Sequence, residues 1–232
     1  MALDRRATRT NVGRAKYMIN ETQGIEPSNR LFWKSLRHKD FSRKYRYFIW
    51  MTAHNGYKTG DYWTNITNFE HRANCVFCGE TESMEHILTE CEKSNHKLIW
   101  SLTEALWQGK TMEWINPCFG TILGCGLIKM INDEGKHLAG DSRLFRIMVS
   151  ESAYLIWKLR CEAVIQGKEI SKIEANRLEL NCLLASTKPT KGRLDKRLVK
   201  NTWLEVLREQ DNLPEEWLGE GGVLVGIRAG MG

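Results

Sequence analysis

Four potential metal ligands lie within seventeen residues of this chain, at Cys75, Cys78, His86 and Cys91. Their spacing is Cys-x2-Cys-x7-His-x4-Cys, and three thiolates with one imidazole form a tetrahedral ligand set that zinc prefers. Four protein ligands fill the zinc shell and leave no position for water or substrate. The pattern therefore predicts one structural zinc ion, around which the neighbouring chain must fold. The alternative is a set of unrelated cysteines and histidines, against which the regular spacing of the four residues argues.

The first half of the ligand set predicts a tight turn. Cys75 and Cys78 are separated by two residues and are followed by Gly79. A glycine at this position can take a positive φ and turn the chain back, so that both sulfurs point at one ion.

The second half of the set predicts a helix that presents an imidazole and a thiolate. We expect it to begin at Thr81 or Glu82 and to carry His86 in its middle. The five-residue step to Cys91 does not match an ideal helical face, which repeats every 3.6 residues. We therefore expect the last turn to tighten or unwind at Glu90 and Cys91.

Several sequence motifs accompany the ligand set in a fixed order. They are Phe32-Trp33-Lys34-Ser35-Leu36, Tyr47-Phe48-Ile49-Trp50-Met51-Thr52, His54 to Asp61 with Trp63, Cys75-Val76-Phe77-Cys78-Gly79, Glu82, His86-Ile87-Leu88, Cys91 and Ile99-Trp100. In this order the motifs resemble the reverse transcriptase zinc-binding domain of non-LTR retroelement polyproteins, particularly the fungal copies. The resemblance implies a module that works beside polymerase and nuclease domains, with template RNA or target DNA as its partner.

The expected organisation is a mainly α fold, with a helical domain built around the small Cys3His zinc-binding module. We expect a basic, linker-like N-terminal segment over residues 1–28, the zinc-binding domain over 29–108, and a helical C-terminal extension packed on it over 109–232. Apolar residues at helical spacing predict the helices, and no alternating pattern predicts a substantial sheet.

Composition indicates an intracellular protein of the nucleus or cytoplasm that is not secreted and does not associate with a membrane. No stretch approaches the roughly 20 apolar residues of a membrane span. Three of the seven cysteines are assigned to metal, and the other four suggest no disulfide framework. No secretory signal peptide opens the chain.

Positive charge is concentrated in the N-terminal part of the chain. Residues 1–50 contain 12 Lys and Arg against 4 Asp and Glu, within a net charge of +6 for the whole chain. A predicted helix over 41–54 has an apolar face and an opposite face that combines guanidinium groups with aromatic rings, formed by Arg43, Arg46, Tyr47 and Trp50. Such a face can neutralise phosphates and stack on unpaired bases. The alternative is that Tyr47 and Trp50 pack under a neighbouring helix.

A second basic stripe is expected on a later helix. Arg193, Arg197 and Lys200 recur at i, i+4 and i+7 and could follow a phosphate backbone. A solvated helix face without a ligand is the alternative interpretation.

The sequence lacks the signatures of the common catalytic centres. It has no Asp-Asp pair for two-metal chemistry and no phosphate-binding glycine loop. We therefore expect a noncatalytic zinc-binding module that binds RNA or single-stranded DNA, and that can also contact the polymerase or nuclease domains of a parent element. Two alternatives remain open: a protein-interaction scaffold derived from the retroelement domain, and an enzyme that has recruited the domain for small-molecule chemistry.

Overall fold

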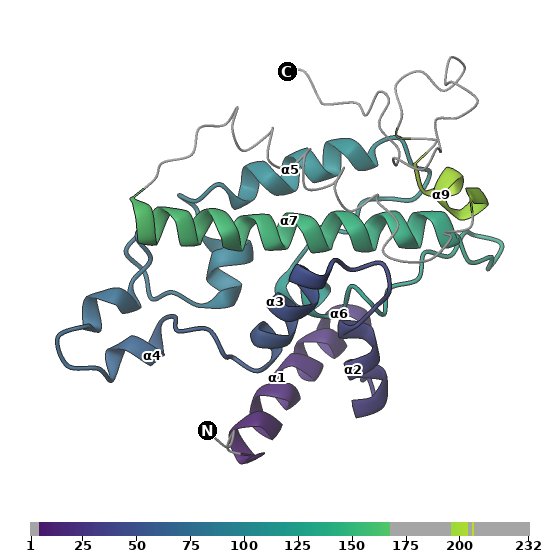
Figure 1. Ribbon diagram of the computed structural model, residues 1–232. Coiled ribbons are helices and arrows are strands. Elements are labelled where there is room, and N and C mark those ends of the chain that lie inside the picture. Colours follow the sequence, from purple (N-terminus) through teal and green to yellow (C-terminus); the bar gives the residue numbers. More distant parts are fainter. Residues whose placement is uncertain (1–4, 168–195, 204–205, 207–232) are drawn as a thin grey trace.

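The computed structural model describes residues 5–167, 196–203 and 206, and this part of the chain is mainly helical (Figure 1). The described residues contain no β-strand, and their β pairing is limited to the isolated bridges Asn74 to Thr81 and Ile131 to His137. The predicted mainly α fold is confirmed. In chain order the elements are α1 (Arg5–Gln23), α2 (Asn29–Leu36), α3 (Arg43–Ala53), α4 (Asp61–Thr64), η1 (Glu70–Ala73), η2 (His86–Glu90), α5 (His96–Trp107), α6 (Phe119–Gly124), α7 (Ala139–Gln166) and α9 (Lys196–Trp203).

Helix α7 is the central element of the fold. It is 28 residues long, and every residue from Gly140 to Ala153 is buried. A helix that is covered on all sides must be surrounded by other elements. Figure 1 shows α5 along one side of α7 and the group of α1, α2, α3 and α6 on the other, while α9 packs near its N-terminal end. The helix ends at Gly167, whose φ of 62° is the left-handed conformation typical of a helix C-cap.

The N-terminal segment differs from the linker expected over residues 1–28. Residues 5–23 form helix α1, and its Val12, Ala15 and Ile19 are buried in the core. These three apolar residues recur at i, i+3 and i+7, the spacing of one helical face. The many arginines of this segment occupy other positions on the same helix, so its high charge does not prevent one side from packing.

Helix α1 packs closely on α6, which lies in a segment rich in glycine. A Cβ atom on Gly120 of α6 would lie 2.3 Å from the backbone oxygen of Met18 on α1. Only glycine therefore allows the two helices to approach this closely. This contact joins the N-terminal helix to the C-terminal part of the described fold.

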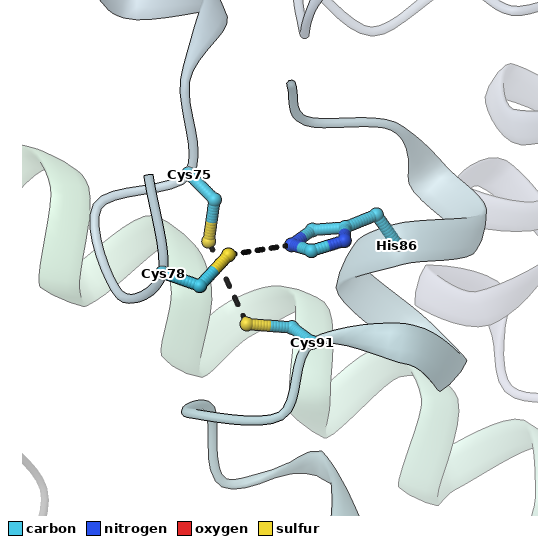
Figure 2. Close-up of side chains that lie close together, drawn as sticks. All are labelled: Cys75, Cys78, His86 and Cys91. Carbon is cyan, nitrogen blue, oxygen red and sulfur yellow. Dashed lines mark hydrogen bonds between the residues drawn. The ribbon is translucent and has the colours of Figure 1, made fainter. Parts of the chain in front are cut away.

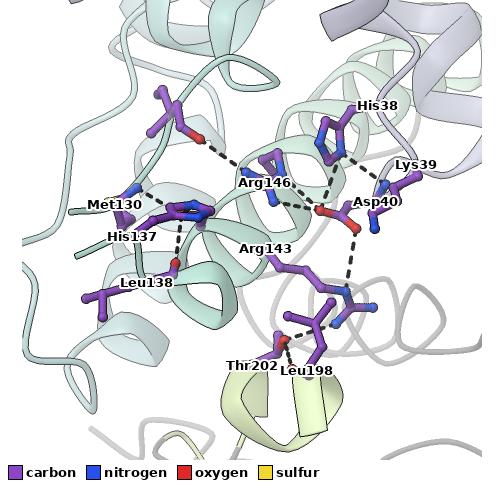
Figure 3. Close-up of polar contacts among 12 residues, drawn as sticks. His38, Lys39, Asp40, Met130, His137, Leu138, Arg143, Arg146, Leu198 and Thr202 are labelled. Carbon is purple, nitrogen blue, oxygen red and sulfur yellow. Dashed lines mark hydrogen bonds and ion pairs between the residues drawn. The ribbon is translucent and has the colours of Figure 1, made fainter. Parts of the chain in front are cut away.

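A buried ion-pair cluster, formed by Asp40, Arg143 and Arg146, connects the segment before α3 with α7 (Figure 3). The Asp40 side chain is 3% exposed, and its Oδ2 accepts from Arg146 Nε at 2.9 Å and lies 2.8 Å from Arg146 Nη2. Arg143 Nε lies 3.6 Å from the other carboxylate oxygen, and its Nη1 donates to Thr202 of α9 at 3.3 Å. One carboxylate thus holds α7 and, through Arg143, α9.

None of the described helices is both long enough and apolar enough to cross a membrane.

Candidate metal centre and nucleic-acid surface

The four predicted ligands converge on one point (Figure 2). Their ligand atoms all lie within 4.8 Å of one another. Cys75 Sγ lies 3.7 Å from Cys91 Sγ, and Cys78 Sγ lies 3.2 Å from His86 Nε2. Zinc–sulfur bonds of tetrahedral geometry would place two sulfurs about 3.8 Å apart. The separation between Cys75 and Cys91 therefore suits a shared zinc ion and is too long for a disulfide bond.

The turn between the first two cysteines has the predicted conformation. Gly79 has a φ of +85°, and its N–H donates to the carbonyl oxygen of Cys75 at 2.9 Å. The N–H of Cys75 donates to Glu80 O at 2.7 Å, so the chain folds back on itself around the two thiols. Both sulfurs consequently face the same side of the loop.

The helical half of the site begins later than predicted and ends in a wide turn. The helix begins after Ser83, whose Oγ accepts from the N–H of His86 at 2.9 Å, and not at Thr81 or Glu82. Its last turn does not tighten but is wider than an α-turn, because His86–Glu90 is a π-helix. The N–H of Cys91 donates to His86 O at 2.9 Å, which spans five residues. This wider turn brings two ligands five residues apart to the same side, which an α-turn would not do.

Two carboxylates lie near the outer nitrogen of the imidazole, and an indole caps the end of the turn. His86 Nε2 faces the sulfurs, while Nδ1 lies 3.9 Å from a Glu80 oxygen and 4.0 Å from a Glu90 oxygen. A carboxylate beside the outer nitrogen is the usual support of a metal-bound histidine. At the end of the turn, Leu88 O accepts from the Trp100 indole N–H at 2.8 Å, which satisfies a carbonyl near the end of the π-turn.

A buried ion pair attaches the metal centre to α7. Glu82 is 2% exposed, and one of its oxygens accepts from Arg160 Nε at 2.8 Å while the other pairs with Arg160 Nη2. The guanidinium also lies over the Trp157 ring, 5.3 Å from its centroid. A bidentate pair of this kind fixes both partners in orientation as well as in distance.

The protein environment alone does not favour a thiolate at Cys75. Burial raises the pKa of the Cys75 thiol to about 12, and the neighbouring Cys91 thiol acts in the same direction. A charged sulfur in this position needs a cation beside it. The donor set, the distances and the burial of the site together fit a divalent ion bound by sulfur and nitrogen.

Helix α3 presents the basic and aromatic face predicted for it. Tyr45, Phe48, Ile49 and Thr52 are buried, whereas Tyr47 is 64% exposed and Trp50 38% exposed. Tyr47 therefore does not pack under a neighbouring helix, whereas Trp50 is partly covered and contacts the His54 ring. The remaining two predicted residues, Arg43 and Arg46, lie on the same helix, the first exposed and the second half-buried.

Three residues beside this face were not among the predicted nucleic-acid ligands. His54, at the C-cap of α3, places its ring 4.2 Å from the Trp50 ring and 5.2 Å from the Trp33 ring of α2. Its Nδ1 lies 2.8 Å from Trp50 O, and Arg37 follows at the C-cap of α2. The i, i+4 steps from Trp33 to Arg37 and from Trp50 to His54 are visible in the sequence. The packing of α2 against α3, which brings these residues together, is not visible in the sequence.

The second predicted stripe is described in part. Arg197 and Lys200 lie on α9 and are exposed, and Arg193 lies outside the described residues. Helix α9 packs against α7 through Thr202, which accepts from Arg143. The two described cations therefore sit on an element that is anchored to the core.

Comparison with known families gives one match. Residues 14–100 match the family model described as zinc-binding in reverse transcriptase. The matched range begins within α1 and ends in α5, so it contains all four ligands as well as α2 and α3. A comparison with curated proteins gives no match, and neither does a comparison with solved structures.

Proposed function

Residues 14–100 match the family of reverse transcriptase zinc-binding domains, and from this match we propose that the chain is a noncatalytic zinc-binding module of retroelement origin that binds RNA or single-stranded DNA. The observation that carries the proposal is the convergence of Cys75, Cys78, His86 and Cys91, together with the exposed aromatic and basic side of α3.

The proposed metal role is structural. One zinc ion bound by the four residues has a filled tetrahedral shell, which leaves no position for a substrate or an activated water. The ion joins the loop around Cys75 to the π-turn that ends at Cys91. The pair between Glu82 and Arg160 extends this connection to α7.

The proposed nucleic-acid role rests on the exposed side of α3. Arg43 and Arg46 supply positive charge for phosphates, and Tyr47 and Trp50 supply exposed ring surface for unpaired bases. Charge and stacking make separate contributions, because only the charge contribution falls steeply with salt.

Binding of the zinc-loaded chain to single-stranded and duplex RNA and DNA, measured at several salt concentrations, tests the proposal. We expect binding whose logarithm falls linearly with the logarithm of the salt concentration. Arg43→Glu should lower the slope by about one. The matched control is Lys97→Glu on α5, where the lysine is exposed and pairs with Glu92. No binding by the zinc-loaded protein, or equal effects of the two substitutions, would contradict the proposal.

A protein-interaction scaffold is the second candidate, and one surface favours it. A groove beside α1 and α2 is lined by four exposed isoleucine and leucine side chains. These are Ile25, Leu31, Ile115 and Ile131, with exposed fractions of 47%, 43%, 38% and 50%. Exposed apolar clusters are typical of protein contacts, and the polymerase or nuclease domains of a parent element are the partners that the family relationship suggests. A flat salt dependence with no nucleic-acid affinity would favour this candidate.

A further inference from the structure

The geometry points to a binding site for one unpaired base in the groove between α2 and α3, where the base stacks on the aromatic rings of Trp33, His54 and Trp50. This inference rests on the proposed function and adds to it a location, a ligand group and residues from a second helix. The groove is lined by Trp33, Leu36, Arg37, Arg46, Tyr47, Trp50 and His54.

The rings form one aromatic cluster. The His54 ring contacts both indoles: it is tilted by 39° against Trp50, at a centroid distance of 4.2 Å, and stacked at 25° on Trp33, at 5.2 Å. The bond between His54 Nδ1 and Trp50 O fixes the imidazole in this position. Trp50 still exposes 38% of its surface, so the aromatic cluster is open to a further planar ring. A base supplies such a ring regardless of its identity.

The charges around the groove favour an anionic ligand. Helices α2 and α3 contain Arg30, Lys34, Arg43, Lys44 and Arg46 and no Asp or Glu. The segment that joins them contains a single carboxylate, at Asp40, and this group is buried against Arg143 and Arg146. The single carboxylate of α2, α3 and the segment between them is therefore paired inside the protein. The positive charge faces outward.

Two guanidinium groups at the groove are held by the backbone. Arg37 Nε donates to Trp33 O at 3.1 Å, and Arg46 donates to His38 O and Lys39 O, both at 3.2 Å. These bonds use only part of the five donors of each guanidinium. The remaining donors are held close to the aromatic cluster, where the phosphates on either side of a stacked base would lie.

The exposed aromatic rings of the groove require a single-stranded ligand. A base within a duplex has both faces covered by its neighbours, so it offers no face to the rings. An unpaired base offers one face to the aromatic cluster, and its flanking phosphates reach the arginines. We therefore assign the groove to single-stranded nucleic acid and not to duplex.

The test compares two strands of the same charge. The first is an oligothymidine of about 12 nucleotides, within the span that single-strand binders cover. The second is a strand of equal length in which every base is replaced by an abasic sugar. The zinc-loaded full chain should bind the base-bearing strand at least about tenfold more tightly. Trp33→Leu and His54→Leu should each reduce that advantage by about tenfold or more, and leave abasic binding and zinc content unchanged. Because Trp33 also packs against the core, thermal denaturation must show that both variants are folded at the assay temperature.

Trp63→Leu is the matched control, because Trp63 is a partly exposed indole outside the groove whose ring contacts Arg72 and Phe69. It should leave binding to both strands as in the wild type. If both groove variants bound the base-bearing strand with wild-type affinity, the groove assignment would be wrong. The proposed function would still stand, and a protein segment would be the next candidate ligand of the groove. If the groove variants lost equal affinity for the base-bearing and abasic strands, the groove would contact phosphates and not bases. That result would also overturn the groove assignment. No wild-type binding to either strand would overturn the proposed function and this inference together.

Discussion

The metal centre and the Asp40 ion-pair cluster both bury charged groups, but they differ in how the chain assembles them. The four ligands of the metal centre come from seventeen consecutive residues. In the cluster, Asp40 and Arg146 are 106 residues apart, and Arg143 contacts Thr202 from 59 residues away. The centre thus depends on short-range geometry and an added cation, whereas the cluster depends on the completed fold and supplies its own counter-charges.

This difference separates two kinds of stability. Removing the ion should release the loop around Cys75 and the π-turn, while α1, α3 and most of α7 keep their own apolar contacts. Removing the Asp40 carboxylate should weaken the contacts of α7 with the segment before α3 and with α9, and leave the ligands in place. The predictions below test that separation.

The largest effect is expected at the metal ligands. Cys78→Ser and His86→Ala should each lose the ion and loosen residues 70–108, because structural zinc in small modules contributes on the order of 10 kcal/mol. Elemental analysis and hydrogen exchange would measure the two outcomes. Cys118→Ser is the control, since the Cys118 thiol lies beside Thr22 and Thr121, apart from the ligand set, and the variant should keep full metal content. One zinc retained in the His86 variant, with unaltered thermal stability, would rule out this ligand set.

A smaller loss, without a change in metal content, is expected at the ion-pair cluster. Asp40→Ala leaves two buried guanidinium groups without their carboxylate, which should cost about 3–5 kcal/mol in the free energy of unfolding. Chemical denaturation measures the loss, and elemental analysis should still find the metal. Adding Arg146→Met should restore part of the stability, because one uncompensated charge is then removed. A loss of zinc in the Asp40 variant would show that the two regions are not separable.

The same contrast explains what the sequence could predict. The ligand set was evident because Cys75, Cys78, His86 and Cys91 lie close in the chain and each residue type has a known preference for zinc. The buried face of α3 was evident from the 3.6-residue period of Tyr45, Phe48, Ile49 and Thr52. The five-residue step from His86 to Cys91 indicated an irregular turn. It did not indicate whether this turn is wider or tighter than an α-turn, because either kind interrupts an α-helix.

Features that depend on contacts between distant segments could not be predicted. The expected linker over residues 1–28 came from its charge, and the packing of α1 on α6 became clear only with the fold. The Asp40 cluster joins three segments, so no local pattern indicated that its carboxylate is buried. The aromatic cluster of Trp33, His54 and Trp50 likewise requires the crossing of α2 and α3.

The connection between the metal centre and α7 should have an intermediate effect. Glu82→Gln should cost about 2 kcal/mol, less than the Asp40 variant, because Arg160 is 13% exposed on its side chain and water can reach it. A double-mutant cycle with Arg160→Met isolates the coupling. Competition with a chelator should show faster zinc release in the Glu82 variant. Additive losses in the cycle would mean that the pair does not couple the two regions.

The smallest effect is expected from His38, which touches the ion-pair cluster and makes it sensitive to acid. Burial, followed by the charge of Arg146, lowers the pKa of His38 from 6.5 to about 4, and its Nδ1 accepts from the N–H of Asp40 at 3.2 Å. Between these pH values the folded protein keeps the ring neutral while the unfolded chain binds a proton. Stability should therefore fall as the pH is lowered from 6.5 towards 4. His38→Asn keeps a hydrogen-bond acceptor without the titration, so its free energy of unfolding should fall less over this range. Zinc release in acid affects both proteins alike and cancels in the comparison. Parallel curves of unfolding free energy against pH for the two proteins would contradict the prediction. They would show that the folded protein does not hold the His38 imidazole neutral.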